Sequence, residues 1–304
     1  MQIFDSFKST INQSLDLFLG HKIVIKREDL IHPRVSGNKF RKLKYIFQEI
    51  KEKEVSALLT FGGAFSNHLA ATAYAGKNNG VHTIGIVRGD EWERKINESA
   101  TLNYCVTQGM ELHCVSRDIY TQKEQAPIVS KLMNKMLGLR IIPEGGTEPL
   151  AVKGCLEILE SEDHDFDVIC SSVGTGGTLA GLVNSSNYNQ NLIGFNALNN
   201  TEIVQTIEEL TNKNNWFIEN GYTFGGYAKI KPNLISFMND FYQQYKIPLD
   251  PIYTGKLLFG IFDLIKNNQW VFGKKILIIH TGGLQGIEGM NQKLAKKAAP
   301  QIIT

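Results

Sequence analysis

The sequence has no long hydrophobic run and little net charge. Its apolar runs are short, as at 168–170 and 276–279, whereas a membrane-spanning helix needs about 20 apolar residues. A net charge of +2 over 304 residues argues against nucleic acid or an anionic membrane as a partner. The first residues, Met1–Asp5, lack the charged and apolar regions of a signal peptide. These absences predict a soluble globular protein.

Cysteine is scarce and scattered. The chain has four, Cys105, Cys114, Cys155 and Cys170, and none shows the CxxC spacing of a metal or redox motif. Three of them lie in apolar stretches, so we expect small core residues. The simplest compartment for such a chain is the reducing cytoplasm.

Short strand-like runs alternate with helical patterns along most of the sequence. This alternation predicts an α/β fold whose parallel sheets are covered on both faces. The Pro- and Gly-rich stretch at 143–149 and the high number of strands favour two sheets. The segment 202–251 has Asn-rich stretches and Gly225-Gly226, and beyond its first helix we interpret it as active-site lining or loop. We expect strands at 58–61, 82–87, 111–115, 140–142, 168–173, 192–196 and 275–280. We expect one helix from about residue 67, and further helices at 92–107, 123–137, 150–161, 179–184, 202–210, 255–266 and 286–297.

Lys39 stands in the segment Ser36–Lys44, SGNKFRKLK, after a polar turn and before a helix-like stretch. Three more cations follow within five residues. Crowded cations disfavour an added proton, and a Schiff-base lysine needs a neutral amine near pH 7. The alternative is a basic helix start on the surface.

The run Gly174, Thr175, Gly176, Gly177 and Thr178 follows an apolar strand and opens a helix. Such a loop turns successive N–H groups inward at a positive helix N-terminus, which suits one compact phosphate. No lysine follows the last glycine, so it is not a Walker loop, and the missing GxGxxG spacing disfavours a dinucleotide. The alternative is a glycine-rich turn needed only for packing.

Two more polar motifs follow expected strands. In the segment Gly62–His68, Ser66 is either a helix cap or, with the helix start, a carboxylate site in which Asn67 donates to a second polar atom. The motif His280-Thr281-Gly282-Gly283 ends the last strand, where parallel sheets place ligands. A lysine, a phosphate loop, a carboxylate site and a polar strand end together point to pyridoxal 5′-phosphate.

The motifs Lys26–Asp29, Gly37–Leu43 and Gly62-Gly63 with Ser66-Asn67 resemble the 1-aminocyclopropane-1-carboxylate (ACC) deaminase / D-cysteine desulfhydrase family. The resemblance covers nearly the whole chain in the family's order. It implies a pyridoxal-phosphate enzyme with the tryptophan synthase β-subunit-like fold (fold type II). It also implies a large cofactor-binding domain from residues 1–45 and 150–304, a small α/β domain from 46–149, and a homodimer.

The resemblance assigns roles to individual positions. It implies that Lys39 binds the cofactor aldehyde, that Lys42 lies close by, and that Asn67 contacts the phenolic oxygen. Ser66 would lie near the substrate as a candidate acid or base. The remaining assignments are the phosphate loop Gly174–Thr178, the active-site tyrosines Tyr253 and, as a looser match, Tyr227, and the ring-side residues Thr281 and Thr254.

Two departures from the family pattern bear on the reaction. ACC deaminases carry a glutamate after the tyrosine of Asp-Pro-x-Tyr and a leucine in His-x-Gly-Gly, where this chain has Thr254 and Thr281. A carboxylate at the ring nitrogen would keep it protonated and make the ring a strong electron sink, which a hydroxyl does not. Opening a cyclopropane needs that sink more than β-elimination does.

The predicted function is therefore D-cysteine desulfhydrase-like α,β-elimination to sulfide, pyruvate and ammonia. The alternatives are ACC ring opening, elimination from another amino acid such as serine, a pyridoxal-phosphate-binding protein without turnover, and a nucleotide-binding Rossmann protein.

Overall fold

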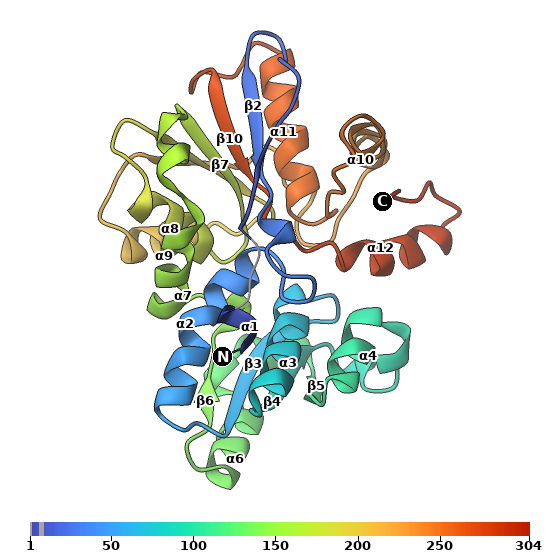
Figure 1. Cartoon of the computed structure of the whole chain (residues 1–304). Helices are drawn as coiled ribbons and strands as arrows, with labels where there is room; N and C mark the ends of the chain where they lie inside the picture. Colours follow the sequence, from blue (N-terminus) through green and yellow to red (C-terminus); the bar gives the residue numbers. More distant parts are fainter. Residues whose placement is uncertain (1, 6–8) are drawn as a thin grey trace.

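Two separate β-sheets organise the chain in the computed structural model, which describes residues 2–5 and 9–304 (Figure 1). Every strand pairing is parallel except that of β1 with β2. One sheet has the order β1 (Asn12–Ser14), β2 (Lys22–Lys26), β10 (Lys275–Ile279), β7 (Val168–Val173), β8 (Asn191–Asn196) and β9 (Trp216–Glu219); the other has the order β5 (Glu111–Val115), β4 (His82–Arg88), β3 (Ala57–Gly63) and β6 (Arg140–Ile141). The predicted α/β class with two parallel sheets is confirmed.

The helices connect these strands. They are α1 (Gln2–Asp5), α2 (Asn38–Glu52), α3 (Asn67–Asn79), α4 (Ala100–Thr107), α5 (Arg117–Thr121), α6 (Pro127–Lys135), α7 (Pro149–Cys155), α8 (Gly177–Ser185), α9 (Ile203–Leu210), α10 (Pro232–Tyr245), α11 (Thr254–Lys266) and α12 (Gly286–Ala295). Within residues 2–5 and 9–304, none of the helices has both the length and the apolar character that crossing a bilayer requires.

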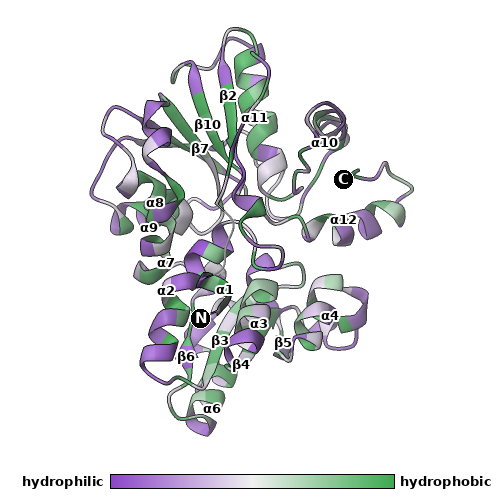
Figure 2. Cartoon of the chain, in the orientation of Figure 1, coloured by the Kyte–Doolittle hydropathy of each residue, from purple (hydrophilic) through white to green (hydrophobic). Residues whose placement is uncertain are grey.

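The six-stranded sheet brings together strands from near the two ends of the sequence. β10 pairs with β2 on one side and β7 on the other, so the blue and the red-orange strands lie side by side in Figure 1. Alternate residues of β2 enter different cores: Ile23 and Ile25 face one cluster, and Val24 faces the other. Because helices cover both faces, these strands are nearly continuous hydrophobic runs, which Figure 2 shows mostly in green.

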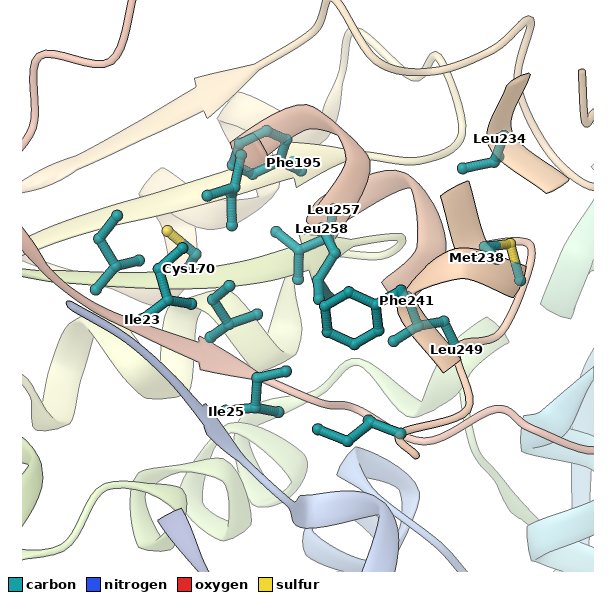
Figure 3. Packing of buried hydrophobic residues seen from close by; sticks show 14 of the residues in the cluster. Ile23, Ile25, Cys170, Phe195, Leu234, Met238, Phe241, Leu249, Leu257 and Leu258 are labelled. Atoms are coloured by element: carbon teal, nitrogen blue, oxygen red, sulfur yellow. The ribbon is translucent and has the colours of Figure 1, made fainter. Parts of the chain in front are cut away.

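The first of these cores packs α10, α11 and α12 against the sheet. Figure 3 shows Leu257 and Leu258 of α11 and Phe241 of α10 near the strand residues Ile23 and Ile25. The second core holds Leu179 and Leu182 of α8, Ile203 and Ile207 of α9, and Cys155 at the end of α7. This double cover fixes the carboxyl ends of the strands, where a ligand is expected.

Helix α2 joins the two halves of the molecule. Its Phe40, Leu43 and Ile46 pack with Leu58 of β3 and with Ala151 of α7. The predicted domain boundary at residue 45 falls inside α2, and the one at 149 falls at the start of α7. The division into domains 1–45 with 150–304 and 46–149 stays a prediction.

Several predicted elements differ from the observed ones. The helix expected over 92–107 is α4 alone, because Ser99 caps its start by accepting from Leu102 N (3.2 Å), and short 3-10 turns precede it. The helix expected over 150–161 ends at Cys155 and continues as a 3-10 turn. The one expected over 123–137 begins at Pro127, which occupies the first helical position of α6. β9 and α10 lie in the segment interpreted as lining or loop.

The expectation for the cysteines is confirmed. Cys105, Cys155 and Cys170 are buried, Cys114 is partly buried, and all four are free thiols. Burial raises the pKa of each thiol, so they remain protonated core residues at neutral pH.

Candidate active site

A cavity of about 280 Å³ opens where the carboxyl ends of β3, β4 and β7 meet the loop after β10. Its size is at the lower end of small-molecule sites, which hold about 300–1,000 Å³. The structure brings most of the predicted site residues into its lining: Lys39, Lys42, Ser66, Asn67, Gly174, Thr175, Gly176, Thr178, Tyr227, Tyr253 and Thr281. Gly177 and Thr254 are not in that lining.

Lys39 is the second residue of α2 and is buried, with 8% of its surface exposed. The turn before it is tight: Gly37 has φ +61°, and a Cβ there would lie 2.0 Å from the carbonyl oxygen of Thr281. Lys39 Nζ donates to Asn38 Oδ1 at 3.2 Å. Burial, followed by the charge of Lys42, lowers the pKa of Lys39 to about 7. Its amine is therefore partly neutral at physiological pH.

The predicted cause of that neutrality is only partly right. Of the nearby cations, Lys42 alone lowers the pKa of Lys39, and burial has the larger effect. Arg41 instead forms a two-pronged ion pair with buried Glu28 (both contacts 2.9 Å), and Lys44 pairs with Glu157 at 2.7 Å. On a helix, residues one apart point in different directions, so sequence crowding is not crowding in space.

The lowered pKa of Lys39 makes the stability of the cofactor-free protein depend on pH. An unfolded lysine titrates near 10.5, so above about pH 7 the unfolded chain binds more protons here than the folded one. Stability then rises with pH, by up to about 1.4 kcal/mol per pH unit for one group. We expect the Tm of cofactor-free protein to rise from about pH 7 to about pH 8.5, and to rise less in Lys39→Met.

Scanning calorimetry of both proteins tests this. The window stops near pH 8.5 because cysteines and tyrosines, whose pKa values burial raises, act in the opposite direction at higher pH. Equal slopes in the two proteins would contradict a depressed pKa at Lys39.

Lys42 and the glycine loop line one end of the cavity. Lys42 Nζ donates to Gly145 O and Thr147 Oγ1, both at 3.0 Å, and lies 3.4 Å from Thr175 Oγ1. No acceptor among the described residues takes the N–H groups of Thr175, Gly176 and Gly177. Gly177 thus contributes a backbone donor as the first residue of α8, and its missing side chain leaves room for Lys42, since a Cβ would lie 3.3 Å from Nζ. Unpaired donors beside a lysine at a helix start fit a phosphate group.

Ser66 fulfils its capping role and still lines the cavity. Its Oγ accepts from Leu69 N at 3.3 Å, so its own O–H remains free to donate. The N–H groups of Asn67 and His68 also have no acceptor within residues 2–5 and 9–304. These donors at the N-terminus of α3 suit a carboxylate.

The two predicted tyrosines lie on the same cavity. Burial raises the pKa of Tyr227 to about 12 and raises the pKa of Tyr253 well above its usual value. Both hydroxyls therefore keep their protons at neutral pH and act as hydrogen-bond donors more readily than as bases. Tyr253 also packs on the glycine loop, because a Cβ on Gly174 would lie 3.1 Å from its ring.

Thr254 does not face the cavity, which corrects its predicted place beside the cofactor. It is fully buried, and its hydroxyl donates to Asp250 Oδ2 at 2.7 Å. Asp250 also accepts from the backbone N–H groups of Ile252, Tyr253 and Thr254. Thr254 therefore helps Asp250 cap α11 and hold Tyr253 in place.

The cavity also contains residues that sequence reasoning did not assign. Ser172, at the end of β7, has its Oγ 3.2 Å from Thr281 Oγ1. Asp250, Arg88 and Glu144 bring charged groups into the lining. The Asp-Pro-x-Tyr motif pointed to Asp250, and the strand end pointed to Ser172, but no local pattern marks Arg88 or Glu144.

His68 also lines the cavity and is buried beside Thr60. Thr60 Oγ1 donates to Ile142 O (2.9 Å), so it accepts from His68 Nε2, 2.8 Å away. Burial and the charges of Lys39 and Lys42 lower the pKa of His68, which keeps the ring neutral.

Comparison with known proteins agrees with this geometry. The chain matches the family model "Pyridoxal-phosphate dependent enzyme" over residues 11–282. It is 30% identical to a Thermotoga maritima protein named "Putative 1-aminocyclopropane-1-carboxylate deaminase", over 90% of this chain and 93% of that protein. It is 27% identical to the mitochondrial "Bifunctional D-cysteine desulfhydrase/1-aminocyclopropane-1-carboxylate deaminase" of Arabidopsis thaliana, over 88% and 74% of the two chains. The crystal structure of an ACC deaminase homologue, 27% identical, covers 95% of this chain and 94% of its own with a TM-score of 0.79.

The chain therefore belongs to the pyridoxal-phosphate-dependent enzyme family, with the fold type II architecture and pyridoxal 5′-phosphate as its cofactor. Within that family it is an enzyme of the ACC deaminase/D-cysteine desulfhydrase type. The residues present fit the cofactor: a buried amine at Lys39, N–H donors at Thr175–Gly177 that have no acceptor among the described residues, and the hydroxyl pair of Ser172 and Thr281 at the carboxyl ends of the neighbouring strands β7 and β10.

Proposed function

We propose that this enzyme is a carbon–sulfur lyase that converts D-cysteine into sulfide, pyruvate and ammonia. The Arabidopsis relative is named for both D-cysteine and cyclopropane chemistry, so names alone do not separate the two. The observation that supports elimination is the hydroxyl pair of Ser172 and Thr281, which supplies no negative charge at the strand ends.

The carboxylates in the cavity lining are already engaged. Asp250 caps α11 with both oxygens. Glu144 accepts from Tyr120 Oη and from Lys123 Nζ, both at 2.6 Å. Neither is free to hold a ring nitrogen protonated, so the site favours a reaction in which the leaving group takes the electrons.

The residues divide the work of such an elimination. When bound, pyridoxal phosphate supplies an aldehyde for an amine and a ring that takes up electrons. Lys39 would hold the aldehyde, and Lys42 with the N–H groups of Thr175–Gly177 would hold the phosphate. Ser66 O–H and the start of α3 would orient the substrate carboxylate.

Proton transfer then falls to Lys39. The Lys39 amine would accept the α-proton at Nζ near neutral pH, because burial lowers its pKa to about 7 in the cofactor-free chain. Hydrosulfide leaves from the β-carbon with the electron pair of the C–S bond. The released enamine hydrolyses to pyruvate and ammonia.

A turnover screen of the holoenzyme tests the proposal. We expect sulfide and pyruvate from D-cysteine at a kcat/KM at least about tenfold above that for 2-oxobutyrate formation from the cyclopropane substrate, a difference of about 1.4 kcal/mol in barrier. L-cysteine and both serines complete the panel. Faster opening of the cyclopropane would reverse the assignment, and no turnover of any compound would favour a binding protein.

We also propose a cytoplasmic homodimer, as the family resemblance and the reduced thiols suggest. Light scattering after gel filtration measures the assembly, and a mass near 34 kDa, that of one chain, would contradict it.

A further inference from the structure

Arg88 places an unassigned guanidinium at the cavity wall. It is the last residue of β4 and pairs in register with Gly63, the last residue of β3. A Cβ on Gly63 would lie 3.5 Å from Arg88 Nη2, so the missing side chain leaves that face of the guanidinium toward the cavity. The same arginine lines two shallower pockets outside. It therefore stands between solvent and the active site.

The charge of Arg88 has no counter-ion in the part of the chain that the structure describes. No carboxylate lies within 4.0 Å of it, and none of its N–H groups makes a hydrogen bond there. Its Cζ lies 5.5 Å from the ring centre of Tyr227 and 5.7 Å from that of Tyr120. Aromatic faces position a guanidinium but leave its N–H edge free for an anion.

Two neighbouring cations, unlike Arg88, are paired with carboxylates. Arg117 is held by Glu91 (2.5 and 3.1 Å), and Lys123 by Glu144. Arg117, Lys123 and Lys229 share the outer pocket with Arg88, so the entrance is cationic, yet Arg88 alone of these four also lines the inner cavity.

We propose that Arg88 is an anion subsite for the substituent on the β-carbon of the substrate. The inference rests on the proposed function and deepens it. The start of α3 already provides donors for the α-carboxylate, which leaves Arg88 for a second negative charge. The substrates are then small amino acids whose β-substituent departs as an anion.

The subsite matches the charge flow of elimination. The Cα–H and Cβ–S bonds break, and a Cα–Cβ double bond forms. The α-proton goes to Lys39 Nζ, and the electron pair leaves on sulfur as hydrosulfide. A neutral thiol thus becomes an anion facing the guanidinium, so Arg88 interacts more strongly with the departing group than with the bound substrate. Aspartate carries a carboxylate on the same β-carbon. Because this carboxylate does not leave, aspartate resembles the state in which the departing group is negatively charged.

Binding of aspartate and alanine to the holoenzyme, followed through the cofactor absorbance, tests the subsite. The two ligands differ only in the β-carboxylate, and both the D and the L series are measured. We expect wild-type protein to bind aspartate at least about tenfold more tightly than alanine in one series, which corresponds to about 1.4 kcal/mol. The ratio should fall to about one in Arg88→Gln and stay unchanged in the matched control Arg117→Gln.

Each outcome has a definite meaning. No preference for aspartate in wild-type protein, or a preference that survives Arg88→Gln, overturns the subsite. An equal loss in both variants assigns the effect to the general positive charge of the entrance and also overturns it. A retained preference without sulfide release from D-cysteine leaves the subsite standing and removes the proposed function. Cofactor absorbance and Tm of Arg88→Gln, compared with wild type, show that the variant is folded and loaded.

Discussion

Lys39→Ala should abolish the covalent attachment of the cofactor and reduce turnover of D-cysteine by about 1,000-fold or more. The variant loses both the amine that holds the aldehyde and the base at Nζ, and a positioned base alone contributes about 10²- to 10⁴-fold. The visible absorption of the lysine-bound cofactor should disappear. Reduction with borohydride followed by peptide mass spectrometry should find the modified residue at position 39 in wild-type protein and nowhere in the variant.

Lys44→Ala is the matched control. Lys44 belongs to the same helix and the same basic segment, but its side chain pairs with Glu157 outside the cavity. This variant should keep the chromophore and turnover within about threefold, because a partly exposed ion pair contributes only about 0–1 kcal/mol. A lysine-linked chromophore in Lys39→Ala would contradict the assignment, and so would equal losses in both variants.

Gly37→Ala should lower the free energy of unfolding by about 3 kcal/mol or more and empty the cofactor site. A Cβ at Gly37 would lie 2.0 Å from the carbonyl oxygen of Thr281 and 2.7 Å from Gly282 N, so backbone must move. The backbone at Gly37, with φ +61° and ψ −144°, adds about 1–3 kcal/mol for any residue with a side chain, because glycine almost alone adopts it. Because Gly37 precedes α2, the shift also displaces Lys39 within the cavity that it shares with Thr281 and the glycine loop.

Gly20→Ala separates the two causes. Gly20 has φ +79°, but a Cβ there meets nothing within 4 Å. It should therefore cost only the conformational part, about 1–2 kcal/mol, and leave cofactor binding intact. Denaturant unfolding and titration with pyridoxal phosphate measure both variants. An equal loss of unfolding free energy in the two variants would show that the clash with the Thr281 carbonyl does not contribute to the destabilisation.

Much of the fold was accessible from local patterns. The strands β3, β4, β5, β7 and β8 were expected within one or two residues, because short apolar runs of strand length, most of them next to a glycine, are local signals. The errors concentrate where short-range signals compete. Ser99 follows a 3-10 turn and caps α4, so the helix begins after it. Helix α10 was not predicted because its segment is rich in polar residues. Its apolar face, with Leu234 and Met238, is recognised only where it packs against α11.

In the candidate site, too, residues in local motifs were predicted correctly, and residues placed only by packing were not. Lys39, Ser66, Asn67, the glycine loop and Thr281 lie on one cavity, as strand-end motifs in parallel sheets predict. Thr254 was misplaced because a residue adjacent to a site tyrosine points the other way and meets Asp250. Arg88 had no signal at all, since a lone arginine at a strand end is ordinary in sequence.

The sequence by itself determined which chemistry this protein carries: the lysine, the phosphate loop and the helix start are local arrangements of backbone and side chain that need only a few consecutive residues. The tertiary structure alone decided the electrostatics. Burial, more than neighbouring cations, lowers the pKa of Lys39. The carboxylate of Asp250 caps α11, and Arg88 has no counter-ion within residues 2–5 and 9–304. Desolvation and Coulomb energy depend on distances and burial in space, and these are set by the packing of two sheets around α2.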